Sequence, residues 1–177
     1  MTGLKVGDRM PDFRGTDQNG KEITNQDFAG KKLVIYFYPK DFTFVCPTEI
    51  AAFARLHNEF ADRNTVVLGG SVDNEYSKLG WRREHKDLHG LASWQFADTT
   101  GSLVDQLGIR EKVSGVALRA TFIVDPENVI QHVSVNNLKV GRSPQEVLRI
   151  LDGLQTDDLC PCNRAIGGAT LDEDEGC

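Results

Sequence analysis

Cys46 stands where the sequence changes from an apolar run to an amphipathic pattern, and Pro47 follows it directly. The apolar run covers residues 33–38 and ends at Pro39. Proline is favoured at the first position of a helix, so Pro47 predicts that Cys46 lies at or just before a helix N-terminus. Free backbone N–H groups and the positive end of the helix dipole stabilise a thiolate at such a position. Cys46 is therefore a candidate nucleophile.

A buried structural cysteine is the simpler alternative, because cysteine is among the most buried residue types. Three features count against it: the proline-marked helix start, Thr43 three residues earlier, and the pair Cys160 and Cys162 in a tail whose composition suggests mobility. A mobile thiol suits a resolving partner, which must travel to reach a sulfenic acid and close a disulfide. We interpret Cys46 as redox-active.

The other cysteines and the histidines allow a metal site to be considered. Cys160 and Cys162 form a CxC pair and no CxxC occurs, which disfavours a dithiol within one site and the common zinc-finger spacings. His85 and His89 form an HxxxH pair that could complete a four-ligand zinc site with the CxC pair. Nothing in the sequence brings these segments together, so two solvated histidines are the simpler interpretation. We expect no metal, haem or flavin, and no role for Cys177.

The bulk properties limit the classes of partner. The 177 residues carry a net charge of −6, and no basic patch offsets this acidity, which argues against a nucleic-acid partner. The longest apolar run is far shorter than the roughly 20 residues that span a membrane, and the start lacks the apolar core of a signal peptide. We expect a cytoplasmic protein, where thiols are kept reduced and cysteines are more often catalytic than structural.

Strand and helix patterns alternate along most of the chain, which predicts an α/β fold with a central mixed sheet. Strands are expected at residues 33–38, 65–72, 121–124 and 129–135. Helices are expected after Pro47, over residues 74–86, around residues 102–107, and from Pro144, with Ser143 as its cap. No linker to a second domain is visible. Residues 172–177 are acidic and poor in apolar residues, and we expect them to be disordered.

The motif Pro39-x-x-x-Thr43-x-x-Cys46 resembles the active-site signature of the peroxiredoxins. The longer stretch of residues 39–53 resembles the typical 2-Cys branch of that family, in particular its alkyl hydroperoxide reductase C type. The resemblance covers most of the chain and includes Arg119 with the strand that it opens, Arg142 and the CxC tail.

This resemblance implies a thioredoxin-like fold with a central mixed sheet flanked by helices. A peroxidase domain is expected at residues 1–155, followed by a mobile tail at residues 156–177 that carries the resolving cysteine. The implied activity is reduction of hydrogen peroxide and organic hydroperoxides by a thiolate, without a cofactor. Cys46 would attack the terminal oxygen of the hydroperoxide, release water or an alcohol, and become a sulfenic acid.

The same resemblance assigns roles to the residues around the nucleophile. Thr43 is expected to hydrogen-bond the peroxide, Arg119 to hold both thiolate and substrate, and Pro39 to shield the pocket from water. Glu49 and Arg142 are expected to orient Arg119.

Acidity of the thiol cannot supply most of the implied acceleration. For a cysteine in general, lowering the pKa from about 8.5 to about 6 raises the thiolate fraction at neutral pH roughly 30-fold. The same change lowers nucleophilicity by roughly 10- to 18-fold, taking the Brønsted slope of thiol exchange as a guide. The larger contribution must therefore come from donors directed at the charge that develops on the breaking O–O bond.

Turnover needs a second thiol, and Cys160 matches the resolving position of the family. There, the resolving cysteine of one subunit attacks the sulfenic acid of another, which implies a homodimer, and rings of dimers are a family expectation. Cys162 resembles the extra cysteine of a CxC-tailed branch, and it would substitute for Cys160 or relay the disulfide to a reductant. A small CxxC adaptor, thioredoxin and a flavoprotein disulfide reductase stay open as that reductant.

Other interpretations of the cysteines stay open at this point. A holdase chaperone or a redox relay could use the same thiols, and a thiol-disulfide oxidoreductase could use the CxC pair alone. Among the peroxidases, the tail lacks a Tyr-Phe pair and residues 89–92 are not a Gly-Gly-Leu-Gly loop. These departures predict resistance to overoxidation of Cys46 to the sulfinic acid.

Overall fold

The structure of the chain is a computed structural model that describes residues 3–171. It divides into two compact units, Met1–Arg142 and Ser143–Cys177. The expected division into a domain at residues 1–155 and a mobile tail at residues 156–177 stays a prediction. The acidic end at residues 172–177, with Cys177, lies outside the described residues.

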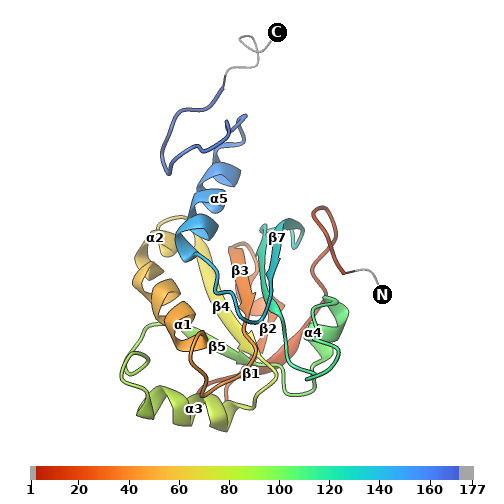
Figure 1. Cartoon of the computed structure of the whole chain (residues 1–177). Coiled ribbons are helices and arrows are strands. Elements are labelled where there is room, and N and C mark those ends of the chain that lie inside the picture. Colours follow the sequence, from red (N-terminus) through yellow and green to blue (C-terminus); the bar gives the residue numbers. More distant parts are fainter. Residues whose placement is uncertain (1–2, 172–177) are drawn as a thin grey trace. The chain divides into compact units, whose positions relative to one another are not determined.

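One mixed sheet forms the centre of the described part of the first unit (Figure 1). Its seven strands follow the order β2-β1-β5-β4-β3-β6-β7. Their bounds are β1 (Arg14–Asp17), β2 (Glu22–Thr24), β3 (Lys32–Phe37), β4 (Thr65–Ser71), β5 (Trp94–Ala97), β6 (Arg119–Val124) and β7 (Ile130–Asn136). Strand β4 is parallel to β3 and β5, and the other neighbouring pairs are antiparallel.

Helices connect most consecutive strands of the first unit, except β1 with β2 and β6 with β7. Their bounds are η1 (Asn25–Phe28), α1 (Cys46–Arg55), α2 (His57–Ala61), α3 (Glu75–Glu84) and α4 (Ser102–Gln106). No helix within residues 3–171 combines the length and the apolar character needed to span a membrane.

Strand β3 is buried on both faces, which explains its continuous apolar sequence. On one face, Leu33 and Phe37 belong to a hydrophobic core that includes Leu103 of α4. On the other face, Tyr36 stacks on Phe53 of α1, with the ring centroids 4.1 Å apart. The sheet therefore lies between helices on both sides, and the end of β3 leads directly into the loop before α1.

The second unit consists of α5 (Pro144–Thr156) and the segment that follows it. Ser143 caps the helix by accepting a hydrogen bond from the backbone N–H of Glu146, as predicted. The following segment folds back on α5, because Arg164 pairs with Asp152 at 2.8 Å and its carbonyl accepts a hydrogen bond from Arg149.

Most of the expected elements are present near their predicted positions. One difference concerns the apolar pattern of residues 50–60, which belongs to two helices, α1 and α2, with a break at Leu56. The short strands β1, β2 and β5 were not expected, and they are only three or four residues long.

Candidate active site

Cys46 is the first residue of α1 and is fully buried, with Pro47 in the first turn, as its sequence context predicts. The helix begins without a side-chain cap at Val45. The backbone N–H groups of this turn and the positive end of the helix dipole therefore lie close to the thiol, and both favour negative charge.

Arg119, the first residue of β6, contacts the Cys46 thiol. Strand β6 pairs with β3, the strand that leads into the loop before Cys46. The Arg119 Nη1 atom lies 3.4 Å from Cys46 Sγ and 2.6 Å from Glu49 Oε2. Its Nε atom donates a hydrogen bond to the Leu138 carbonyl at 2.7 Å. The guanidinium is therefore held in one orientation by two fixed acceptors, and it is 4% exposed.

Glu49 lies between Arg119 and Arg142. Its Oε1 atom accepts hydrogen bonds from Arg142 Nε at 2.9 Å and from the Arg142 backbone N–H at 3.0 Å. Arg142 also donates to the Ala120 carbonyl at 2.7 Å, and its guanidinium lies over the Tyr36 ring, 5.2 Å from the centroid. Glu49 thereby fixes both arginines relative to α1.

The charges of this cluster are unequal. One carboxylate and two guanidiniums leave a net positive charge among buried side chains beside Cys46. This excess positive charge lies beside the sulfur atom that would attack a substrate, where it can stabilise negative charge in the transition state.

Thr43 and Pro39 lie on the loop between β3 and α1, and both are partly buried. The Thr43 hydroxyl donates a hydrogen bond to the Lys40 carbonyl at 2.8 Å. Because its hydrogen is used in this way, the Thr43 oxygen is left as an acceptor, which suits the O–H group of a hydroperoxide.

The CxC cysteines belong to the second unit. Cys160 and Cys162 are exposed and, like Cys46, are free thiols. Cys160 Sγ lies 3.5 Å from the Thr156 hydroxyl and 3.7 Å from the Gly153 carbonyl, at the end of α5. The resolving role of Cys160 stays a prediction. Within the first unit, direct contacts join four of the predicted residues: Cys46, Glu49, Arg119 and Arg142.

The alternative zinc site has no counterpart in the part of the chain that the structure describes. No three His, Cys, Asp or Glu side chains gather there in a way that could hold a metal ion. The ring of His85 instead accepts a hydrogen bond from the Asp87 backbone N–H at 3.3 Å.

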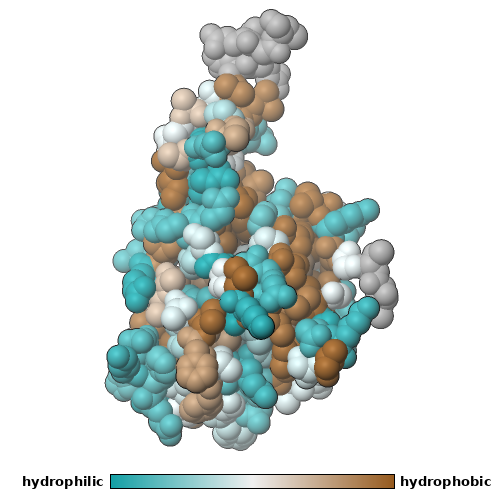
Figure 2. Space-filling model, viewed as in Figure 1, coloured by the Kyte–Doolittle hydropathy of each residue, from teal (hydrophilic) through white to brown (hydrophobic). Residues whose placement is uncertain are grey.

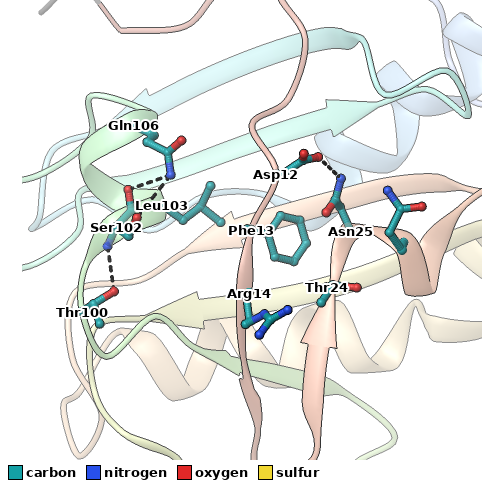
Figure 3. Close-up of a pocket in the computed structure, with 10 residues that line it drawn as sticks. Asp12, Phe13, Arg14, Thr24, Asn25, Thr100, Ser102, Leu103 and Gln106 are labelled. Carbon is teal, nitrogen blue, oxygen red and sulfur yellow. Dashed lines mark hydrogen bonds between the residues drawn. The ribbon is translucent and has the colours of Figure 1, made fainter.

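A pocket of about 490 Å³ lies between the N-terminal strands and α4, and Cys46 does not line it (Figure 3). Polar groups that line it already pair with one another, as in the 2.7 Å hydrogen bond from Asn25 to Asp12. None of the predicted site residues lines it. Its lining residues are Asp12, Phe13, Arg14, Thr24, Asn25, Gln26, Thr100, Ser102, Leu103 and Gln106.

Two charged residues beside the Thr43 loop were not predicted from the sequence. Lys78 of α3 and Asp41 of the loop form a buried ion pair, with 3.3 Å between Nζ and Oδ1. Asp41 lies inside the motif, between Pro39 and Thr43, and its charge at that position could have indicated a role in the site. Nothing comparable marks Lys78, because it lies in a polar helical stretch that resembles a solvated surface.

The fold and this thiol centre define a class, the cysteine-dependent enzymes with a thioredoxin-like sheet. The AhpC/TSA family model matches residues 6–133. Alkyl hydroperoxide reductase C of Mycolicibacterium smegmatis is 44% identical over 190 residues, which cover 99% of this chain and 97% of that protein. The 2-Cys peroxiredoxin BAS1 of Spinacia oleracea is 42% identical over 96% of this chain and 68% of its own length.

Solved structures show the same fold. AhpC of Mycobacterium bovis superposes with a TM-score of 0.85 at 42% identity, covering 92% of this chain and 99% of that one. The reduced 2-Cys peroxiredoxin of Plasmodium vivax gives a TM-score of 0.87 at 35% identity, covering 93% and 91%. The chain belongs to the AhpC/TSA family and is a peroxiredoxin, so the predicted family and fold class are confirmed. The names of these relatives do not favour the chaperone or relay alternative.

Proposed function

We propose that this peroxiredoxin reduces hydrogen peroxide and organic hydroperoxides through Cys46. The observation that carries the proposal is the 3.4 Å contact between Cys46 Sγ and an arginine that Glu49 holds in place. The relatives that are named alkyl hydroperoxide reductase support the same substrate class.

In the first step the Cys46 thiolate attacks the terminal oxygen of the hydroperoxide. An S–O bond forms, the O–O bond breaks, and the leaving oxygen takes a proton to become water or an alcohol. Arg119 lies where it can stabilise the charge on the breaking bond, and the Thr43 oxygen can accept a hydrogen bond from the incoming O–H group. Pro39 shields the surroundings of Cys46 from water. Cys46 is left as a sulfenic acid.

In the second step Cys160 of a partner subunit attacks that sulfenic acid, releasing water and forming a disulfide. The exposure of Cys160 and the free state of both thiols support this pairing. Cys162 then relays the disulfide to a protein reductant, for which we favour a CxxC adaptor or thioredoxin. A reducing compartment, the cytoplasm, suits free cysteines of this kind.

A homodimer that assembles into a ring completes the proposal. Strand β7 is an edge strand of the described sheet, and Val135 on it is exposed. Figure 2 shows hydrophobic surface in the region of this strand. Because an unpaired sheet edge tends to pair with another chain, and most oligomers are symmetric, β7 is the surface that we expect the two subunits to share.

Serine variants of the four cysteines test the proposal. Cys46→Ser should consume no hydrogen peroxide, whereas the double variant Cys160→Ser with Cys162→Ser should consume one equivalent per subunit and then stop as the sulfenic acid. Cys177→Ser is the matched control and should turn over like the wild type with each candidate reductant. Peroxide consumption by Cys46→Ser, or steady turnover by Cys160→Ser without Cys162, would contradict the assigned roles.

A further inference from the structure

A charged cluster outside the predicted site lies beside the loop between β3 and α1. The side chains of Lys78 and Asp41 are 0% and 1% exposed. Besides Asp41, the Lys78 Nζ atom contacts the Tyr38 hydroxyl at 3.0 Å and the Ser71 hydroxyl at 2.6 Å. The cluster thus joins α3 and the end of β4 to the loop that carries Thr43.

Asp41 is fixed both by its side chain and by its backbone. Its Oδ1 atom accepts hydrogen bonds from Lys78 and, at 2.8 Å, from the Tyr38 hydroxyl. Its backbone N–H donates to Asp73 Oδ2 at 2.9 Å. Asp41 lies two residues before Thr43, so these contacts determine where the chain enters the segment that leads to the nucleophile.

The residue between them, Phe42, has a strained backbone. Its φ of +57° lies in the left-handed region, which a bulky side chain rarely adopts. Such a conformation persists only where the surrounding structure holds it. Asp41 holds the N-terminal side, and α3 holds the ring, because the Phe42 and Trp81 ring centroids are 5.9 Å apart. Helix α3 therefore supports this segment through two separate contacts, Lys78 with Asp41 and Trp81 with Phe42.

Stability alone gives little reason for this buried pair. Burial lowers the pKa of Lys78 and raises the pKa of Asp41, so the site is costly for both charges. Asp41 Oδ2 has no hydrogen-bond partner among residues 3–171. Apolar residues of similar volume often replace a buried ion pair without loss of stability. An effect on the geometry of the loop explains the pair better than an effect on stability.

We propose that Lys78 is a positioning residue for peroxide reduction, acting through Asp41 and the left-handed Phe42 to hold the Thr43 oxygen at the substrate. This inference rests on the proposed function. It adds Lys78 of α3 to the residues that determine the reaction rate.

The first test replaces Lys78 by methionine, which retains the length of the side chain and removes its charge. We expect the second-order rate constant for Cys46 oxidation by hydrogen peroxide to fall about 10- to 100-fold, the scale of a misplacement near 1 Å. The melting temperature should fall, because the buried Asp41 carboxylate loses its partner. Arg83→Met is the matched control, because Arg83 is an exposed cation on the same helix, and it should react like the wild type.

The second test separates positioning from a general structural effect. If Lys78 acts through the Thr43 hydroxyl, Lys78→Met should slow the wild type but should slow a Thr43→Val variant by less than about twofold, because coupled residues are not additive. The double variant Lys78→Met with Asp41→Asn removes both buried charges while retaining their volumes. It should fold and should be as slow as Lys78→Met alone.

Three results would overturn the inference: a wild-type rate in Lys78→Met, an equal loss in the Thr43→Val background, or a wild-type rate in the folded double variant. Failure of the proposed function itself would look different. In that case the wild type would not consume peroxide, or Cys46→Ser would still consume it.

Discussion

Replacing Glu49 by glutamine separates the charge beside Cys46 from the placement of Arg119. Glutamine retains the shape of the side chain, but it removes the negative charge and turns one oxygen into an N–H donor. In the wild type, both carboxylate oxygens accept hydrogen bonds from arginines, at 2.6 Å from Arg119 and 2.9 Å from Arg142. In the variant, at least one guanidinium loses its acceptor and faces a donor.

The two consequences act on the rate in opposite directions. Residues three positions apart on a helix lie about 5–6 Å apart, and two like unit charges at that distance repel each other by roughly 3 kcal/mol at an effective dielectric of 20, so removing the Glu49 charge favours an anion nearby. That gain is largely cancelled, because a more stable thiolate is a weaker nucleophile. Loss of a charged hydrogen bond costs about 1.5–3 kcal/mol. If Arg119 needs that bond in the transition state, the rate falls about 10- to 160-fold.

Rapid mixing with hydrogen peroxide measures the rate constant of Cys46 oxidation. Glu49→Gln should react more slowly than the wild type. Glu59→Gln, at an exposed position on α2, is the matched control and should match the wild type within about twofold. A Glu49→Gln enzyme that reacts as fast as the wild type would refute the argument that placement of Arg119 outweighs charge.

Three further predictions concern stability. Arg142→Met should lower the free energy of unfolding by about 3–5 kcal/mol in denaturant titrations, since it removes one partner from the buried Glu49; a loss below about 1 kcal/mol would contradict this. Hydrogen bonds from the backbone N–H and the hydroxyl of Thr24 lower the pKa of Asp27 below 3.8, so its stabilising effect is present at neutral pH and is lost as the pH falls through the lowered value. Asp27→Asn should therefore be less stable than the wild type at neutral pH and equally stable in acid. A difference in stability between the two proteins that persists in acid would exclude this linkage. Ser143→Ala should cost about 1 kcal/mol of α5 stability, visible as faster amide exchange in the first turn, whereas unchanged exchange there would rule out the cap.

The sequence predicts those elements whose signal is local. The run at residues 33–38 is apolar because β3 is covered on both faces, and Pro47 and Pro144 mark the starts of α1 and α5. Strands β1 and β2 escaped prediction because they are short and have few apolar residues. These strands are stabilised by pairing with each other, and β1 also pairs with β5. The sequence of each short segment alone does not reveal these pairings.

The candidate site divides in the same way. Cys46, Thr43 and Glu49 come from one local motif, whereas Arg119 and Arg142 required the family resemblance because they lie far away in the sequence. Lys78 escaped both approaches. The sequence of α3 is polar overall, and the burial of that lysine results from the packing of α3 against the Tyr38 and Ser71 side chains.

The register of the sheet explains how Arg119, 73 residues from Cys46, reaches the thiol. Strands β3 and β6 are antiparallel neighbours, with Tyr36 opposite Thr121. Because antiparallel strands run in opposite directions, the residue that opens β6 lies level with the residue that follows β3. That level is where the loop to α1 begins. A shift of one residue in this register would turn the Arg119 side chain to the opposite face of the sheet, away from Cys46. The β3–β6 pairing therefore determines the active site as directly as the motif around Cys46 does.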